Sequence, residues 1–202
     1  MAILVIAEHD NESLKPASLN TVTAAKEIEG EIEVLVAGKD CQSVADKAAR
    51  IAGVTKVIIA DDVCYQYQLA ESVAPLVAEI GKNYSYLLAA ATTTGKNLLP
   101  RVAALLDVAQ ISDIVEVLSK DTFVRPIYAG NAMATVQSSD QIKVITVRTT
   151  AFSEAEVTGD GIIEPTNFTV QQDSSIFVSE QLSKSERPEL TSASIIVSGG
   201  RG

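Results

Sequence analysis

Short apolar runs alternate with longer amphipathic stretches along the first half of the chain. The runs show no polar alternation, which is typical of strands covered on both faces of a parallel sheet. The stretches between them repeat apolar residues at helical spacing. The predicted strands are therefore 2–7, 32–37, 56–60 and 84–91, and the predicted helices are 18–28, 42–52, 69–80 and 98–106.

Local signals mark the ends of these helices. Ser18 is a possible cap for the first helix, and Gly53 takes the C-cap position of the second. Asn97 is expected to cap the fourth helix, since Pro100 fits best in a first turn. Four strand–helix units joined by short turns imply right-handed crossovers, so we predict a three-layer α/β/α, doubly wound fold with a mainly parallel sheet.

The pattern changes after residue 107. Short strand-like pieces separated by turns rich in Ser, Asn, Asp and Gly predict a late antiparallel β meander at the edge of the sheet. Residues 153–168 are polar and are predicted to form a loop, and residues 183–192 are predicted to be a connector that leaves the domain. The meander strands are 114–118, 123–128, 132–136 and 144–147, and further short strands are predicted at 176–178 and 194–197.

The loop 92–96 lies at the end of the predicted fourth strand, on the sheet edge where α/β proteins bind ligands. Its Gly-Lys pair suggests a phosphate loop, but that motif needs Gly where Ala90 stands and Ser or Thr where Asn97 stands. The alternative is that its three threonines satisfy backbone groups in a tight turn while Lys96 faces solvent. We favour this structural role, and a ligand site stays the alternative.

The other candidate residues have ordinary structural explanations. Asp61 and Asp62 follow the third strand and could bind a metal or act as acid and base, but no third ligand is in sight and helix capping is favoured. His9 could line a cleft or sit in a partly exposed turn. Cys41 and Cys64 lack CxxC or zinc spacing and are predicted to be reduced thiols. No catalytic or metal-ligating residue is assigned.

Composition narrows the classes of partner. The chain has 202 residues and a net charge of −10. This acidity argues against nucleic acid and anionic membranes as partners, since both reward clustered Lys and Arg. No apolar run approaches the length of a membrane span, and the first strand begins without a charged leader. We therefore expect a soluble protein without membrane insertion that is not secreted, or one that has already been processed.

The last residues have the character of a new unit. The predicted strand 194–197 runs into Ser198, Gly199, Gly200 and Arg201. A strand that feeds a glycine-rich turn with a guanidinium is how a phosphate-binding strand–helix unit begins. Two interpretations fit this ending: a glycine tail, and a larger protein cut at the threshold of its second domain.

Three stretches of the chain resemble the alpha subunit of electron transfer flavoprotein. They read ATTTGKNLLPRVAALLD at 91–107, RPIYAGNA at 125–132 and ERPELTSASIIVSGGRG at 186–202. The resemblance implies that residues 1–182 form the family's amino-terminal α/β domain, which faces the beta subunit. It also implies that residues 183–202 are a connector and the first strand and glycine turn of a truncated FAD-binding domain.

The resemblance also implies a function. The family is a heterodimer of alpha and beta subunits that accepts electrons from flavin dehydrogenases, such as the acyl-CoA dehydrogenases of fatty acid β-oxidation. It passes them to the respiratory chain through a quinone oxidoreductase. The chain is then part of an electron carrier with no enzymatic activity of its own, in a bacterial cytoplasm or, alternatively, a mitochondrial matrix.

FAD carries the redox chemistry in this family. The resemblance places the flavin mainly in the carboxyl-terminal domain of the alpha subunit, so the full-length subunit holds FAD and this fragment is not expected to retain it. The family's arginine that contacts FAD matches Arg201, next to Gly199 and Gly200. The family's adenine mononucleotide belongs to the beta subunit, which agrees with a structural role for residues 92–97.

Three functional hypotheses follow. The first is the base domain of the carrier, which would pack on the beta subunit through apolar edge elements that include the meander 123–136. The second is a self-contained adenine-nucleotide-binding module that uses residues 92–97 and the acidic residues after the third strand. The third is a scaffold subunit that binds only protein.

Overall fold

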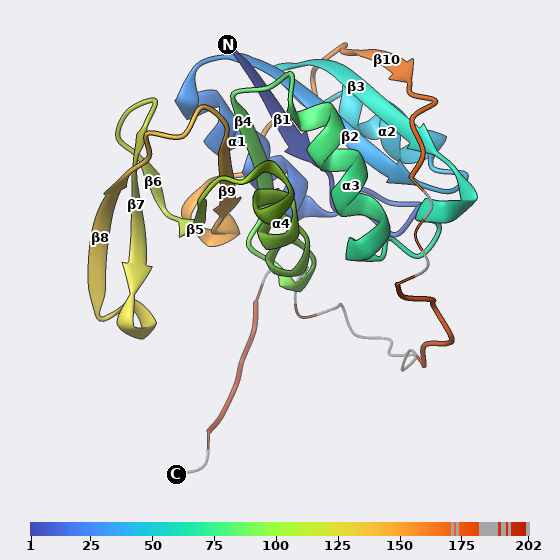
Figure 1. Cartoon of the computed structure of the whole chain (residues 1–202). Helices are drawn as coiled ribbons and strands as arrows, with labels where there is room; N and C mark the ends of the chain where they lie inside the picture. The colour runs from blue at the N-terminus through green and yellow to red at the C-terminus, as the bar shows by residue number, and fades with distance from the viewer. Residues whose placement is uncertain (171, 173, 182–189, 191–192, 194, 201–202) are drawn as a thin grey trace.

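The computed structural model describes residues 1–170, 172, 174–181, 190, 193 and 195–200. Seven strands form one parallel sheet in the order β10-β3-β2-β1-β4-β9-β5 (Figure 1). The chain moves outward from β1 first in one direction and then in the other, so the sheet is doubly wound. The strands are β1 (Ala2–Ile6), β2 (Glu31–Gly38), β3 (Val54–Asp61), β4 (Tyr86–Ala90), β5 (Gln110–Ile114), β9 (Lys143–Val147) and β10 (Ile162–Pro165).

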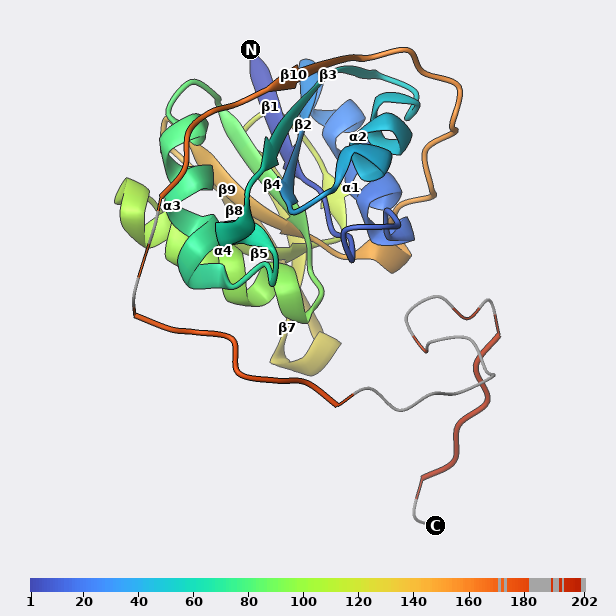
Figure 2. The same cartoon turned by 90° about the vertical axis from the view of Figure 1, so that its right-hand side faces the viewer.

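Helices cover both faces of this sheet, which confirms the three-layer prediction. Figure 2 shows α1 and α2 on one side of the sheet and α3 and α4 on the other. Three short 3-10 helices complete the described secondary structure outside the strands. The helices are α1 (Pro16–Ile28), α2 (Gln42–Ala49), α3 (Ala70–Gly81), α4 (Thr93–Leu106), η1 (Val63–Tyr65), η2 (Tyr128–Gly130) and η3 (Thr149–Ala151).

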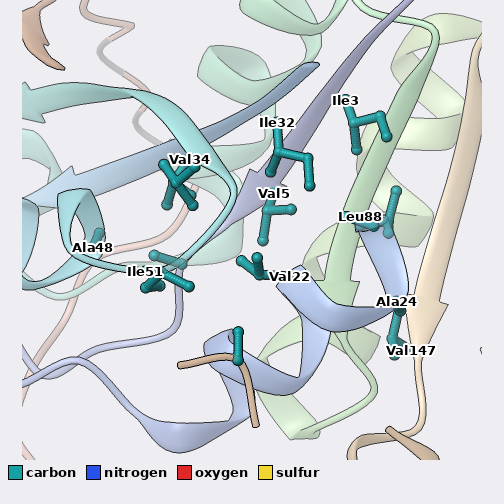
Figure 3. Close-up of a cluster of buried hydrophobic side chains, with 14 of the residues drawn as sticks. Ile3, Val5, Val22, Ala24, Ile32, Val34, Ala48, Ile51, Leu88 and Val147 are labelled. Carbon is teal, nitrogen blue, oxygen red and sulfur yellow. The ribbon is translucent and has the colours of Figure 1, made fainter. Parts of the chain in front are cut away.

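Two apolar cores hold the layers together, one on each face. The first lies under α1 and α2, where side chains from β1, β2 and β4 meet those of the two helices (Figure 3). The second lies under α3 and α4. Because alternate residues of a strand point to opposite faces, each central strand contributes to both cores, which explains its continuous apolar sequence. In β1, Ile3 and Val5 enter the first core and Leu4 and Ile6 the second.

Two helix caps differ from the prediction. The first helix begins at Pro16 with Lys15 as its N-cap, and the Ser18 hydroxyl instead bonds the backbone of Glu8. The fourth begins at Thr93 with Thr92 as its cap, so Asn97 and Pro100 both lie inside the helix.

A proline inside a helix leaves one carbonyl without its donor, and the cost falls when that carbonyl can reach water. The carbonyl affected by Pro100 is that of Lys96, and both residues are exposed. The second helix also ends earlier than predicted, at Ala49, and Gly53 lies in the following turn with φ +96°.

The late antiparallel sheet is confirmed in part. Strands β6 (Glu116–Val117), β7 (Thr122–Ile127) and β8 (Ala132–Gln137) form it, and the β7–β8 hairpin projects from the body (Figure 1). The predicted strand 114–118 is interrupted at Val115, with one part in each sheet. The prediction that 144–147 belongs to the meander is wrong, because β9 is a parallel strand of the main sheet between β4 and β5.

The predictions for the last third of the chain were less accurate. The segment 153–168 is not all loop, because β10 pairs in parallel with β3 at the sheet edge. Residues 176–178 and 195–197, predicted as strands, have no strand conformation. The predicted connector 183–192 lies, apart from residue 190, outside the described residues.

Across the part of the chain that the structure describes, no helix combines the length and the apolar character that crossing a membrane requires.

Candidate functional site

A cavity of about 330 Å³ opens at the carboxyl ends of β1, β2 and β4, between the amino ends of α3 and α4. This is the point where strand order reverses, and ligands of open α/β sheets bind at such points. Its floor is apolar and its rim is polar. The floor residues are Ile6, Ala7, Ala37, Ala89 and Ala90, and the polar rim residues are Glu8, Gln68, Glu71, Thr93, Thr94 and Asn97.

The predicted loop 92–96 is the first turn of α4. The Thr92 hydroxyl accepts a hydrogen bond from the Gly95 amide at 3.3 Å and donates one to Oε2 of Glu8 at 2.6 Å. Lys96 is exposed, as predicted. The favoured structural role is thus confirmed for Thr92, and this residue also links the ends of β1 and β4.

Gly95 sets how closely α4 approaches β4. A Cβ atom at this position would lie 2.0 Å from the carbonyl oxygen of Ala90, a distance that no side chain tolerates. Only glycine therefore allows the helix to begin directly above the end of the strand. The sequence offered this signal in the Gly-Lys pair, but it indicates close packing and not phosphate binding.

The residues that line the cavity make it acidic. Glu8 and Glu71 line it, and none of the described lining residues is Lys, Arg or His. Arg101 lies outside the lining and pairs with Glu71 at 2.6 Å, which neutralises one of the two carboxylates. The amino ends of two helices point to this region and favour anions, but the remaining carboxylate opposes them. The cavity therefore has the position of a nucleotide site without the cationic side chain that a diphosphate needs.

His9 does not line this cavity and does not sit in an exposed turn. It is buried beside Asn11 and Gln68, and its Nδ1 accepts the Asn11 amide at 3.1 Å. Burial lowers the pKa of His9 to about 4, against a favourable contribution from the neighbouring Asp10 carboxylate. The imidazole is therefore neutral at pH 7, and its role is to order the turn after β1.

The acidic pair at the end of β3 caps turns, as favoured from the sequence. The Asp61 carboxylate accepts the amides of Asp40 at 2.8 Å and Cys41 at 3.2 Å. Asp62 accepts the amide of Cys64 at 2.9 Å. Within the described residues no group of three His, Cys, Asp or Glu side chains could hold a metal ion.

Both cysteines are free thiols, as predicted. Cys41 is fully buried and Cys64 is partly buried. Burial is the largest cause that raises the pKa of each thiol to about 11, with nearby Asp61 and Asp62 adding to it. Since the thiolate is the reactive form, neither cysteine is suited to nucleophilic chemistry near neutral pH.

The residues predicted to contact a cofactor are only partly described. Gly199 and Gly200 are exposed, and a Cβ atom on either would meet no atom within 4 Å. Arg201 lies outside the described residues. The geometry expected for this motif therefore stays a prediction.

A polar cluster that the sequence analysis missed lies inside the sheet. Glu33 of β2 is 7% exposed and accepts a hydrogen bond from the Tyr84 hydroxyl. Lys56 pairs with Glu33 at 2.9 Å and lies 3.7 Å from Glu164 of β10. Glu33 raises the pKa of Lys56 as the largest cause, so the lysine stays charged. The polar residues among the apolar runs of β2 and β3 were the available signal.

The β7–β8 hairpin presents an unusual surface. At its tip Tyr128, Ala129 and Gly130 all have positive φ, between 49° and 90°, and the Tyr128 side chain is 80% exposed. Met133 on β8 is 57% exposed. Tyrosine and methionine are residue types that are enriched in protein interfaces.

Comparison with known proteins assigns the family. A family model described as "Electron transfer flavoprotein domain" matches residues 3–173. The chain belongs to the electron transfer flavoprotein family. This confirms the family resemblance and accounts for most of the described chain.

Individual members of this family are similar to the chain over almost its whole length. The chain is 63% identical over 203 residues to the electron transfer flavoprotein subunit alpha of Pseudomonas aeruginosa, covering 100% of this chain and 66% of the relative. It is 51% identical to the subunit alpha of Bradyrhizobium diazoefficiens, covering 100% and 64%. It is 45% identical to the mitochondrial subunit alpha of Dictyostelium discoideum, covering 98% and 61%. The chain thus spans somewhat less than two thirds of the length of these curated relatives.

Proposed function

We propose that this chain is the amino-terminal part of an electron transfer flavoprotein alpha subunit, and that it serves an electron carrier with no enzymatic activity of its own. The observation that carries the proposal is the family match over residues 3–173, together with relatives named as subunit alpha. Electrons would come from flavin dehydrogenases, such as acyl-CoA dehydrogenases, and leave through a quinone oxidoreductase.

The proposed division of the chain follows the same resemblance. Residues 1–182 would form the base that faces the beta subunit, and residues 183–202 would lead into the FAD-binding domain. The acidic cavity does not fit the diphosphate of FAD, because its described lining has two carboxylates and no cation. Gly199 and Gly200 are exposed and stand in open space, so the family resemblance is what supports their role. These two glycines and Arg201 would hold part of FAD in the full-length subunit, where the flavin supplies the electron transfer.

The β7–β8 hairpin is the proposed contact with the beta subunit. It carries the exposed Tyr128 and the partly buried Ile127 at a tip that extends beyond the body (Figure 1). Replacing both residues by aspartate should block the heterodimer and leave the chain folded, because neither side chain belongs to the apolar cores. An intact heterodimer would remove the hairpin from the interface.

The function itself is tested by a spectrum. We would express the full reading frame that contains this chain together with the candidate beta subunit and record visible absorbance of the purified complex. A flavin spectrum that is bleached by an acyl-CoA dehydrogenase and its substrate supports the carrier. A colourless complex, or the absence of a complex, contradicts it.

The position of the cavity favours a second candidate, an adenine-nucleotide-binding module. Its place at the switch point of the sheet and the first turn of α4 on its rim support this candidate, and its carboxylates oppose it. Adenine nucleotides should raise the melting temperature of the isolated chain if they bind, since a ligand of the native state stabilises it. An unchanged melting temperature leaves the carrier or a purely protein-binding scaffold.

Bacterial relatives and a mitochondrial relative both resemble the chain. We propose a bacterial cytoplasm as its compartment, with the mitochondrial matrix as the alternative. Fractionation of the source cells, followed by detection of the chain, would distinguish them.

A further inference from the structure

Arg125 lies within β7 of the β7–β8 hairpin. It pairs across the hairpin with Ala134, and it lies two residues from Phe123, whose side chain is fully buried in the first core. Residues two apart on a strand point to the same face. The Arg125 side chain is therefore on the face of the hairpin that turns toward the body.

This guanidinium has an unmet bonding capacity. Its Nε is buried and has no hydrogen-bond partner, and no ion pair involves the residue within the described part of the chain. Two other arginines behave in the ordinary way: Arg101 pairs with Glu71 at 2.6 Å and Arg148 with Asp113 at 2.5 Å. Leaving a buried charged donor unpaired is costly, so such a group requires an explanation.

A second cavity, of about 320 Å³, lies beside Arg125. Its only acidic side chain among the described lining residues is Asp140, whose Oδ2 accepts the amide of Ala109 at 3.0 Å. Among the described residues, Asp140 and the Arg125 guanidinium form no ion pair. Nε is the only nitrogen of Arg125 that is both buried and unpaired, so the terminal nitrogens stay accessible. The other polar residues of the cavity, Gln110, Gln137, Ser138 and Ser139, are uncharged.

The chemistry of the site selects its ligand. A planar guanidinium with accessible terminal nitrogens binds a carboxylate through two parallel hydrogen bonds. The chain itself has 26 acidic residues and a net charge of −10, and the described ones leave Arg125 unpaired. The exposed Tyr128 stands at the tip of the same hairpin, and arginine and tyrosine are among the residue types enriched in protein interfaces. A carboxylate on a protein surface therefore fits better than a free small anion.

We propose that the cavity beside Arg125 receives an aspartate or glutamate side chain of the partner subunit, which binds the guanidinium and anchors the hairpin. This inference rests on the proposed heterodimer. It adds a specific electrostatic contact to the apolar tip residues of that interface.

Replacing Arg125 by methionine tests the proposal, because methionine keeps the aliphatic packing and removes the guanidinium. The dissociation constant of the complex with the beta subunit should rise at least about tenfold. The melting temperature of the isolated variant should stay equal or increase, since an unpaired buried donor is removed. A residue with a purely structural role would instead lower the melting temperature.

Arg50 provides the matched control. Its side chain is exposed at the end of α2, and Figure 1 shows α2 beside β3, toward the opposite edge of the sheet from the hairpin. Arg50→Met removes the same charge and should leave the dissociation constant unchanged. If both substitutions raised the dissociation constant equally, the change in net charge would explain the effect and the proposal would be overturned.

Double-mutant cycles identify the partner carboxylate. Arg125→Met should be non-additive with alanine at one acidic residue of the beta subunit and additive with alanine at the others. Additivity throughout, or unchanged binding by Arg125→Met while the wild-type heterodimer forms, overturns this proposal and leaves the proposed function intact. If the wild-type chain forms no heterodimer, both fail.

Discussion

The two sheets of this protein use their side chains differently. The central strands of the parallel sheet are buried on both faces, and even the charged Glu33 within it is paired and hydrogen-bonded. In the antiparallel sheet, β7 carries the fully buried Phe123, whereas Met133 on β8 and Tyr128 at the hairpin tip are largely exposed, and Nε of Arg125 has no partner among the described residues. The central parallel strands are thus enclosed within the chain, whereas the outer part of the hairpin stays at the surface and is our proposed contact with a partner.

This contrast predicts that substitutions in the parallel sheet affect folding and that substitutions in the outer hairpin affect association. The largest effect on folding is expected where α4 packs closely on the end of β4. Gly95→Ala would place a Cβ atom 2.0 Å from the Ala90 carbonyl oxygen. We expect a loss of about 3 kcal/mol or more in the free energy of unfolding, measured by urea titration. Gly199→Ala is the control, because its Cβ atom has open space and stability should not change.

The buried cluster around Glu33 gives the next largest effect. Glu33→Ala leaves the Tyr84 hydroxyl and Lys56 without their shared acceptor, so the free energy of unfolding should fall by about 2–4 kcal/mol. Glu31 lies at the exposed end of the same strand, and Glu31→Ala should change stability by less than about 0.5 kcal/mol. Equal effects of the two substitutions would show that the cluster does not stabilise the sheet.

His9 makes the stability of the body depend on pH. Its pKa is about 4 in the folded chain and about 6.5 when unfolded, so the unfolded state binds the extra proton between these values. The stability contributed by the neutral imidazole is present above pH 6.5 and is lost as pH falls toward 4. We expect the free energy of unfolding to fall by about 2 kcal/mol between pH 7 and pH 5.

Because His9 is the only histidine, His9→Gln isolates this dependence. Urea titrations at pH 7, 6 and 5 should show a much smaller slope for the variant, in which no imidazole titrates. The same slope in wild type and variant would assign the pH dependence to the carboxylates.

The smallest effect is expected on the outer face of the hairpin. Met133 is 57% exposed, so Met133→Ser should change the free energy of unfolding by less than about 0.5 kcal/mol. Phe123→Ala, on the neighbouring strand, should cost about 3–5 kcal/mol because Phe123 is fully buried. A large loss from Met133→Ser in thermal or urea unfolding would show that the hairpin is part of the body after all.

Sequence periodicity predicted the first four strand–helix units well. Their strands are buried on both faces, and consecutive apolar residues such as Ile3, Leu4 and Val5 show this in the sequence itself. Helix ends were harder to predict, because a proline can stand in the first turn of a helix or within it. Pro100 was interpreted as a first-turn residue, but solvent access to the preceding carbonyl allows it within the helix.

Strand pairing could not be predicted to the same degree. Residues 144–147 of β9 are buried on both faces, as in the other central strands, and the overlooked signal was that Val144, Ile145 and Val147 are all apolar. β10 carried no such signal, because it is a mostly exposed edge strand that ends at Pro165. The sequence predicted that the loop beginning at Thr92 lies at the ligand-binding edge of the sheet. It could not predict that Nε of Arg125 lacks a partner among the described residues, because this depends on which residues the fold brings near it.

The position of β9 also determines the order in which the fold can be assembled. β9 joins β4 to β5, yet it follows both of them, and the β6–β8 sheet, along the chain. A ribosome that has released the chain only as far as β8 has therefore made β5 and the hairpin before the strand that attaches β5 to the rest of the sheet. Contacts between strands so distant in sequence form slowly. The edge of β4 therefore stays unpaired until β9 has been made, and an unpaired strand edge is prone to pair with other chains.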